Sequence, residues 1–121
     1  MTGTTLYNHP PLGMPVEVHG YDINLELHSD AATLTLAGDL DAAATDALRG
    51  LLTVVQLTPC VMHVHADGVL GTDLDAFDPL FEAARARRVR GLPNIQVDSV
   101  GDAVRDLFGV LGISAQPPIV L

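Results

Sequence analysis

The strongest constraint on the fold is an alternation of apolar and polar residues that recurs in short segments and then gives way to helical spacing. In residues 23–28 every second side chain is apolar, and the pattern returns in residues 33–36 after the turn-forming segment 29–32. Period-two alternation is typical of a strand with one buried face. Two such segments joined by a short turn predict a β-hairpin, and Gly38 ends its second strand.

The next residues switch to a helical pattern and then back to a strand pattern. Apolar residues from Leu48 to Val55 have the spacing of an amphipathic helix, and Asp41 is placed to cap that helix. Residues 60–64 form a nearly continuous apolar run with β-branched members, as expected of a central strand.

The second half of the chain repeats this order. Its predicted elements are a helix whose buried stripe runs from Phe77 to Ala84, a strand over 94–97, a helix over 104–111 and an edge strand over 119–121. Gly68 and Gly71 place a loop before the first of these helices, and Asp73 or Asp75 is placed to cap it. Residues 99–102 predict a capping box for the second helix.

Strands that alternate with helices predict an α/β fold. We expect a mixed β-sheet of four to five strands, with about three to four helices packed mainly on one of its faces. Residues 16–121 form a single domain in this interpretation. Residues 1–15 hold three of the eight prolines and little periodicity, so they are interpreted as a flexible leader.

The composition excludes several classes of function. The formal net charge is −9 and the chain contains no lysine. Nucleic acids and anionic membranes are bound through clustered cations, so neither is an expected partner. No apolar run is long enough to cross a bilayer, and residues 1–15 lack the pattern of a secretory signal. A single cysteine fits a reducing compartment, so we expect a cytoplasmic protein.

Two local clusters leave alternatives open. Four of the six arginines lie between residues 85 and 90, either as a solvated face near the end of a helix or as a docking patch for an acidic partner. His63 and His65 alternate on the predicted central strand and therefore point to the same side. Two such histidines can ligate zinc, but a third ligand would be needed, so a satisfied or surface pair is the competing interpretation.

Four sequence blocks, taken in order and spacing, resemble the STAS domain, the fold of anti-sigma factor antagonists. They are Leu34–Asp41, which ends in Gly-Asp-Leu-Asp, then Val61–Val69, Asp73 and Leu107–Ile113, and they cover roughly residues 20–113. The resemblance implies a domain that binds an anti-sigma factor through a loop in which a kinase phosphorylates one hydroxyl. It also implies that Asp41 lies beside this loop.

The sequence departs from the family at that loop. Leu74, Asp75 and Ala76 stand where the family has two hydroxyl residues and a glycine, and the nearest hydroxyl belongs to Thr72. Phosphorylation adds about −1.5 to −2 of charge at pH 7, and repulsion then breaks the interface. Asp75 would place a fixed single charge there, either as a partial mimic of the phosphorylated form or as an ordinary helix N-cap.

The residues predicted to bind a partner are named the switch surface here: Asp41, Thr72, Asp73, Leu74, Asp75, Ala76 and Asp78. We expect a non-enzymatic interaction module of the bacterial anti-sigma factor antagonist type, which regulates transcription by partner switching. It would bind an anti-sigma factor or a related kinase-fold partner without the usual phosphoswitch. One alternative is a degenerate STAS protein that serves as a structural subunit or homodimer; a minor one is a metal-dependent enzyme built on His63 and His65. No cofactor is expected.

Overall fold

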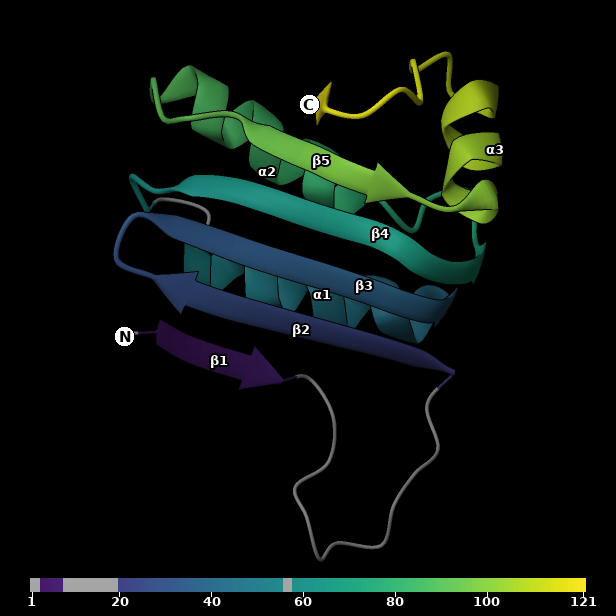
Figure 1. Cartoon of the computed structure of the whole chain (residues 1–121), viewed down its shortest axis with the longest axis horizontal. Coiled ribbons are helices and arrows are strands. Elements are labelled where there is room, and N and C mark those ends of the chain that lie inside the picture. Colours follow the sequence, from purple (N-terminus) through teal and green to yellow (C-terminus); the bar gives the residue numbers. More distant parts are fainter. Residues whose placement is uncertain (1–2, 8–19, 56–57) are drawn as a thin grey trace, which may run out of the picture.

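The computed structural model describes residues 3–7, 20–55 and 58–121, with the backbone alone for residues 3–7 and 55. The strands form one sheet in which spatial order follows chain order, β1-β2-β3-β4-β5-β6 (Figure 1). In sequence the elements are β1 (Gly3–Tyr7), β2 (Tyr21–His28), β3 (Ala31–Leu40), α1 (Ala42–Val55), β4 (Val61–Thr72), α2 (Asp78–Val89), β5 (Ile95–Val100), α3 (Asp102–Val110) and β6 (Ile119–Val120).

The sheet is mixed, as the sequence predicted. β1, β2 and β3 pair antiparallel, β3, β4 and β5 pair parallel, and β6 returns antiparallel to β5. The two parallel connections carry α1 and α2, and right-handed crossovers that advance in one direction place both helices on the same face. Figure 1 shows this arrangement, with α3 beyond the end of β5. The opposite face of the sheet carries no helix of the described chain.

The strands differ from the prediction in number and length. The sheet has six strands rather than four to five, because β1 (Gly3–Tyr7) pairs along β2. This strand lies within the expected leader, whose other residues fall outside the described chain. β4 continues to Thr72, so Gly68 and Gly71 lie in a strand and not in a loop. Glycine at position 68 suits this close pairing, because a Cβ there would lie 3.1 Å from the Cβ of Ala37 on β3, a tight contact.

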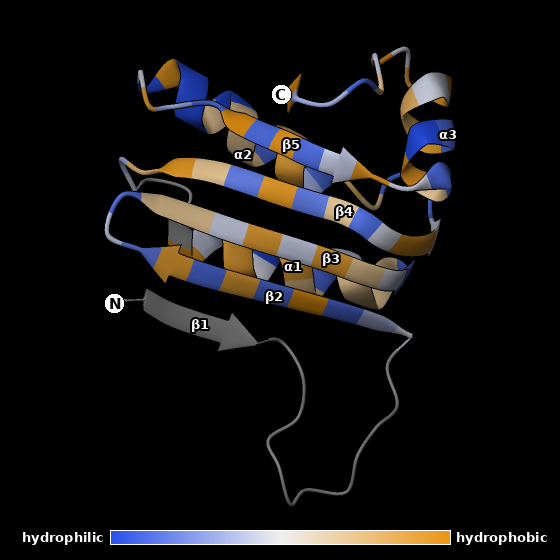
Figure 2. Cartoon of the chain, viewed as in Figure 1, coloured by the Kyte–Doolittle hydropathy of each residue, from blue (hydrophilic) through white to orange (hydrophobic). Residues whose placement is uncertain are grey.

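The core lies between the sheet and the two helices α1 and α2. Along most of β2, β3, β4 and β5 every second side chain is buried, with a shift of one residue after Ala66 in β4 and after Val97 in β5, and Figure 2 shows the alternating hydropathy. Leu48 and Leu52 of α1 and Leu80 and Ala84 of α2 cover the buried sheet positions. The predicted periodicities are therefore confirmed for most of the described positions, although Phe81 is half-buried and Leu111, expected on the apolar face of α3, is 39 % exposed. No helix of the described residues is long and apolar enough to span a bilayer.

Arg87 is a feature that the sequence did not reveal. Its side chain has no exposed surface, although it belongs to the arginine cluster that was expected at a helix surface. The guanidinium donates hydrogen bonds to three backbone carbonyls: Pro93 at 2.8 Å, Thr58 at 2.9 Å and Cys60. Burial lowers the pKa of Arg87 below its ordinary value, and Cys60 acts in the opposite direction. Arg87 thus joins α2 to the segments that precede β4 and β5.

Candidate functional site

The switch surface lies where the parallel strands β3 and β4 end. Leu40 and Thr72 are register partners at the last position of the β3–β4 pairing. The backbone N–H of Asp73 donates to the carbonyl of Leu40 at 2.9 Å, which holds the first residue after β4 against the end of β3. Carboxyl ends of parallel strands commonly form binding sites in α/β sheets, because the chain leaves the sheet there on several strands at once.

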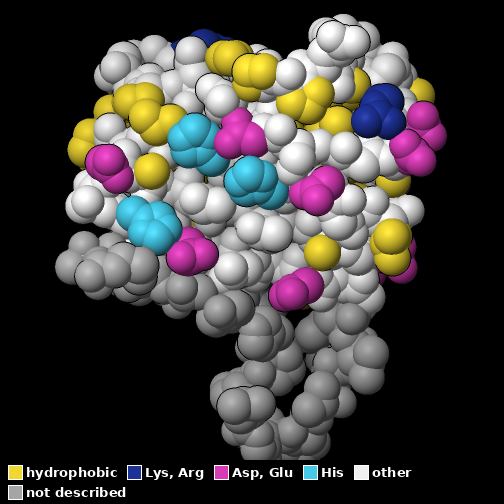
Figure 3. Space-filling view, viewed as in Figure 1, with side chains coloured by type: hydrophobic (Ala, Val, Ile, Leu, Met, Phe, Trp, Pro, Cys, Tyr) yellow, Lys and Arg dark blue, Asp and Glu magenta, His cyan; other side chains and the backbone are white. Residues whose placement is uncertain are grey.

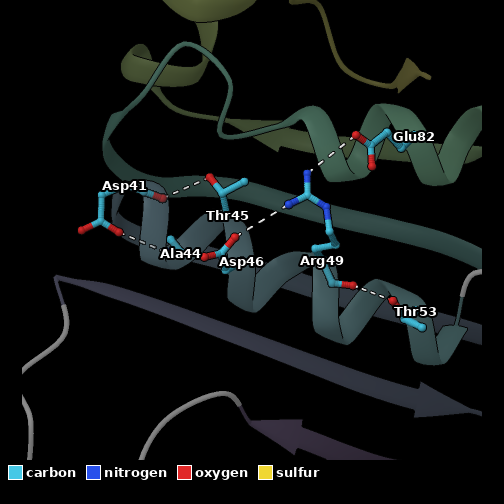
Figure 4. A network of polar contacts seen from close by, with 7 residues as sticks. All are labelled: Asp41, Ala44, Thr45, Asp46, Arg49, Thr53 and Glu82. Atoms are coloured by element: carbon cyan, nitrogen blue, oxygen red, sulfur yellow. Dashed lines mark hydrogen bonds and ion pairs between the residues drawn. The ribbon is translucent and has the colours of Figure 1, made fainter.

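Asp41 caps α1, as predicted. Its Oδ1 accepts the backbone N–H of Ala44 at 3.0 Å, and its carbonyl accepts both the backbone N–H and the hydroxyl of Thr45 (Figure 4). The next turns of the helix are linked to α2, because Arg49 lies 3.7 Å from carboxylate oxygens of both Asp46 and Glu82 (Figure 4). Asp41 therefore has a structural role as the N-cap of α1, and this role accounts for an aspartate at this position.

The prediction that Asp73 or Asp75 caps α2 is wrong. The N-cap residue is Phe77, and no side chain caps the helix. The two aspartates instead accept through their backbone carbonyls: Asp73 from Ala76 at 3.2 Å and Asp75 from the N–H of Asp78 at 3.1 Å. These bonds form a turn between β4 and α2, and the helix begins at Asp78. Phe77, the residue before it, is buried.

Phe77 and Ala76 anchor this turn to the core. Phe77 is fully buried and packs edge-to-face on Phe108 of α3, with ring centroids 5.4 Å apart, while Ala76 is 1 % exposed. Ala76, predicted as part of the partner-binding surface, is therefore inside the protein. A glycine at this position would not fill the space that its methyl group occupies.

The remaining residues of the turn are directed outward. Asp73, Asp75 and Asp78 are exposed, and between the first two lies Leu74 with 62 % of its surface exposed. Thr72 is half-buried as a residue, and its hydroxyl donates an exposed hydrogen bond to the carbonyl of Asp73 at 3.0 Å. What the turn presents is thus an apolar side chain flanked by carboxylates, next to a hydroxyl already used in a backbone hydrogen bond.

A further carboxylate, Asp39, belongs to this region and was not included in the predicted surface. It is paired in register with Gly71, and a Cβ at Gly71 would lie 3.0 Å from its Oδ1. Gly38, with φ of +80°, lies within β3 just before the register shift to Asp39, so the prediction that it ends this strand is wrong, and a Cβ there would meet the carbonyl oxygen of Gly20 at 2.2 Å. The closely spaced glycines were the only sequence signal that a side chain approaches this backbone.

The predicted capping box at residues 99–102 is also wrong. Gly101 is the N-cap of α3 without a side-chain bond, and Ser99 is still in β5. The Ser99 hydroxyl donates to Asp67 at 2.8 Å and lies 3.2 Å from Nδ1 of His65. The hydrogen bond from Ser99 lowers the pKa of Asp67.

Histidines and carboxylates gather on the helix-free face of the sheet (Figure 3). There Nδ1 of His63 lies 2.8 Å from Asp98, so His63 and His65 each contact a side chain of β5. Among the described residues no group of three or more histidine, cysteine or acidic side chains is arranged to hold a metal ion. Nor does Ser99 resemble a nucleophile of a catalytic triad, because it lies between His65 and the carboxylate, whereas a triad places the histidine between them. The metal-dependent alternative has no support from these residues.

Comparison with known proteins identifies the fold. No protein-family profile matches the sequence, and no curated protein is similar to it in sequence. Several solved structures resemble it, including two anti-sigma factor antagonists. An anti-sigma factor antagonist from Mycobacterium paratuberculosis has a TM-score of 0.61 at 16 % identity over 76 % of this chain and 78 % of its own. The anti-sigma factor antagonist SpoIIAA in its unphosphorylated form has a TM-score of 0.62 at 14 % identity over 78 % of this chain and 89 % of its own.

The chain therefore has the STAS fold of anti-sigma factor antagonists, as its sequence blocks indicated. At these identities the likeness establishes the arrangement of sheet and helices. The residues of the switch surface have to be interpreted from their own geometry.

Proposed function

We propose that this protein is a non-enzymatic interaction module of the anti-sigma factor antagonist type. It acts in the cytoplasm and binds an anti-sigma factor or another kinase-fold protein through residues 67–78 and the adjoining helix α2. Its binding is not controlled by phosphorylation of a loop hydroxyl. The two structural neighbours, both described as anti-sigma factor antagonists, support the class of function.

The observation that carries this proposal is the state of Asp75. Its side chain is exposed and makes no cap to α2, so its charge is not used to stabilise the helix. Beside it, Leu74 keeps 62 % of its surface exposed. An exposed apolar residue framed by charges is a common feature of an interaction site, because the apolar group gains from burial and the charges select the partner.

The absence of a phosphoswitch is supported by the hydroxyls that are present. Residues 73–78 contain none, and Thr72 directs its hydroxyl to the carbonyl of Asp73. A kinase would have to break that hydrogen bond and reach a half-buried residue. Asp75 supplies a permanent single negative charge at the position that the resemblance assigns to a hydroxyl. This charge repels an acidic partner surface at all times, although less strongly than a phosphate would.

Affinity capture from the native cell tests the proposal, with the wild type compared with Asp75→Ser and with Asp106→Ser. Asp106 is an exposed aspartate of α3 and serves as the matched control. We expect a kinase-fold protein to bind the purified Asp75→Ser variant at least several-fold more tightly than the wild type, and the control to behave like the wild type. Equal capture by all three proteins would contradict a role for the Asp75 charge.

Incubation with the captured kinase-fold protein and ATP tests the second part. Intact-protein mass spectrometry should show no added phosphate on the wild type. Stoichiometric phosphate on the loop, for example at Thr72, would disprove the absence of a phosphoswitch while leaving the interaction class intact.

A second candidate is a structural STAS subunit with no sigma-factor role. The replacement of both loop hydroxyls by Leu74 and Asp75 favours it, because such a subunit has no need of a phosphoacceptor. Capture of other STAS proteins, with no kinase-fold protein in any of the three samples, would select this candidate.

A further inference from the structure

Charges are segregated along one stripe of α2. Asp78, Phe81, Arg85 and Arg88 are spaced by three, four and three positions, so they follow one side of the helix. Asp78, Arg85 and Arg88 are exposed, and Phe81 is half-buried. The stripe is acidic at the start of the helix, aromatic in the middle and basic at the end.

The charges of this stripe have no partners within the described chain. Of the other arginines, Arg49 is close to Asp46 and Glu82, Arg105 is bound to Asp102, and Arg87 is buried, whereas Arg90 at the end of α2 is exposed and takes part in no ion pair among the described residues. No ion pair among the described residues involves Asp78, Arg85 or Arg88 either. In a chain of net charge −9, guanidinium groups left without a carboxylate point to a contact outside the chain.

An apolar groove runs beside the basic half of the stripe. Its volume is about 220 Å³, and it is lined by both guanidinium-bearing side chains and by Phe81, Ile113, Val120 and Leu121. Pockets for small molecules usually measure about 300–1,000 Å³, so this groove fits part of a protein surface better than a cofactor. Leu74 and Val89, near the two ends of α2, add apolar surface that is 62 % and 83 % exposed.

We propose that the α2 stripe binds a second copy of this chain, with the two α2 helices packed antiparallel about a twofold axis. The stripe is complementary to itself in that arrangement. Asp78 lies opposite Arg88 of the partner subunit, and Phe81 lies opposite Arg85 of the partner subunit. Both pairs share one midpoint along the helix, at position 83, so a single axis satisfies them together. Symmetry then makes each contact twice and closes the assembly as a dimer.

The chemistry of each contact suits this geometry. Carboxylate and guanidinium form charge-assisted hydrogen bonds, and an arginine over an aromatic face gains a cation–π interaction. The inference does not rest on the proposed function, but it uses the same helix α2, so a second copy and a kinase-fold partner would compete for this surface.

Sedimentation of the full chain over a range of concentrations tests this inference. The wild type should show a monomer–dimer equilibrium. Asp78→Arg and Arg88→Asp each place like charges opposite one another, twice per dimer, and should weaken dimerisation roughly tenfold or more. The double variant restores opposite charges and should return to within a few-fold of the wild type. Arg105→Asp makes the same change in net charge on α3 and should have no comparable effect.

A second measurement does not depend on charge reversal. Spin labels attached after Glu82→Cys, in a Cys60→Ser background, should lie close to their symmetry mates because position 82 is next to the axis. Labels attached after Asp106→Cys should be far apart. Circular dichroism confirms that each variant is folded before it is compared.

Three outcomes would overturn the inference. The first is a wild type that stays monomeric up to about 1 mM, which would leave no useful self-affinity. The second is a dimer that responds equally to Arg88→Asp and Arg105→Asp. The third is a double variant that does not recover, since a contact with any other acidic partner would not be restored by swapping both charges of this chain.

Discussion

Replacement of Arg87 by methionine tests whether the buried guanidinium stabilises the fold. Methionine has a similar length, so it keeps much of the packing and removes the hydrogen-bond donors. At least three backbone carbonyls, those of Thr58, Cys60 and Pro93, would lose their donor. Because these carbonyls belong to the two segments that precede β4 and β5, the loss should loosen the junction between α2 and the beginnings of both strands.

The magnitude follows from two opposing terms. An unsatisfied buried carbonyl costs about 1–3 kcal/mol, so three carbonyls give roughly 3–9 kcal/mol. Thr58, Cys60 and Pro93 are themselves partly exposed, so water can satisfy part of this demand, and removal of a buried cation recovers its desolvation penalty. We therefore expect a net loss of about 2–4 kcal/mol, which is a large fraction of the stability of roughly 5–15 kcal/mol typical of a domain.

Urea unfolding followed by circular dichroism measures this loss. The midpoint should fall while the slope stays constant, since the unfolded state exposes the same surface. In thermal unfolding, about 4 °C per kcal/mol at this chain length corresponds to a decrease in Tm of about 8–16 °C. Arg90→Met, at the exposed C-terminal end of the same helix, should change stability by less than about 0.5 kcal/mol. Equal effects of the two substitutions would refute the reasoning.

Two further predictions concern side chains at the strand ends. Asp41→Ala removes the bond to the N–H of Ala44 and should cost about 1 kcal/mol in urea unfolding, whereas Asp106→Ala should cost much less. Ser99→Ala should raise the lowered pKa of Asp67 toward 3.8 in an NMR titration. Because a lowered pKa stabilises the fold above pH 3.8 and this contribution is lost below it, the two proteins should differ in stability near neutral pH and converge in acid; an unshifted pKa would contradict this.

The sequence predicted the main strands and helices because their burial repeats with a regular period. β2 and β3 alternate apolar and polar residues, and α1 keeps its apolar stripe and its cap at Asp41. The extension of β4 through Gly68 and Gly71 could not be predicted in this way. Its pairing depends on close approach to Ala37 and Asp39 on β3, a contact between residues distant in sequence. Local preference for a turn at glycine was overridden by tertiary pairing.

Arg87 shows the same limit for side chains. Composition and helical spacing placed it within a group of surface cations, and nothing local distinguishes it from Arg85 or Arg88. Its burial follows from carbonyls on two other segments that converge on one point of α2. Near the candidate site, the sequence predicted that Asp73 or Asp75 would cap α2, and neither does. The start of α2 is set instead by the burial of Phe77 against Phe108, which periodicity alone did not indicate.

The contrast between Asp41 and Asp75 separates what the fold requires from what an interaction would require. Asp41 accepts a backbone N–H at the start of α1, so its carboxylate is retained by a structural need. Asp75 is exposed, and only its backbone carbonyl takes part in the turn, which any residue would provide. The fold would therefore tolerate serine at position 75 at little cost. The fold does not need the charge of Asp75, which lies beside an exposed leucine, so an effect of this charge on binding can be measured without unfolding the protein. Asp75→Ser is therefore the decisive substitution for the function of this surface.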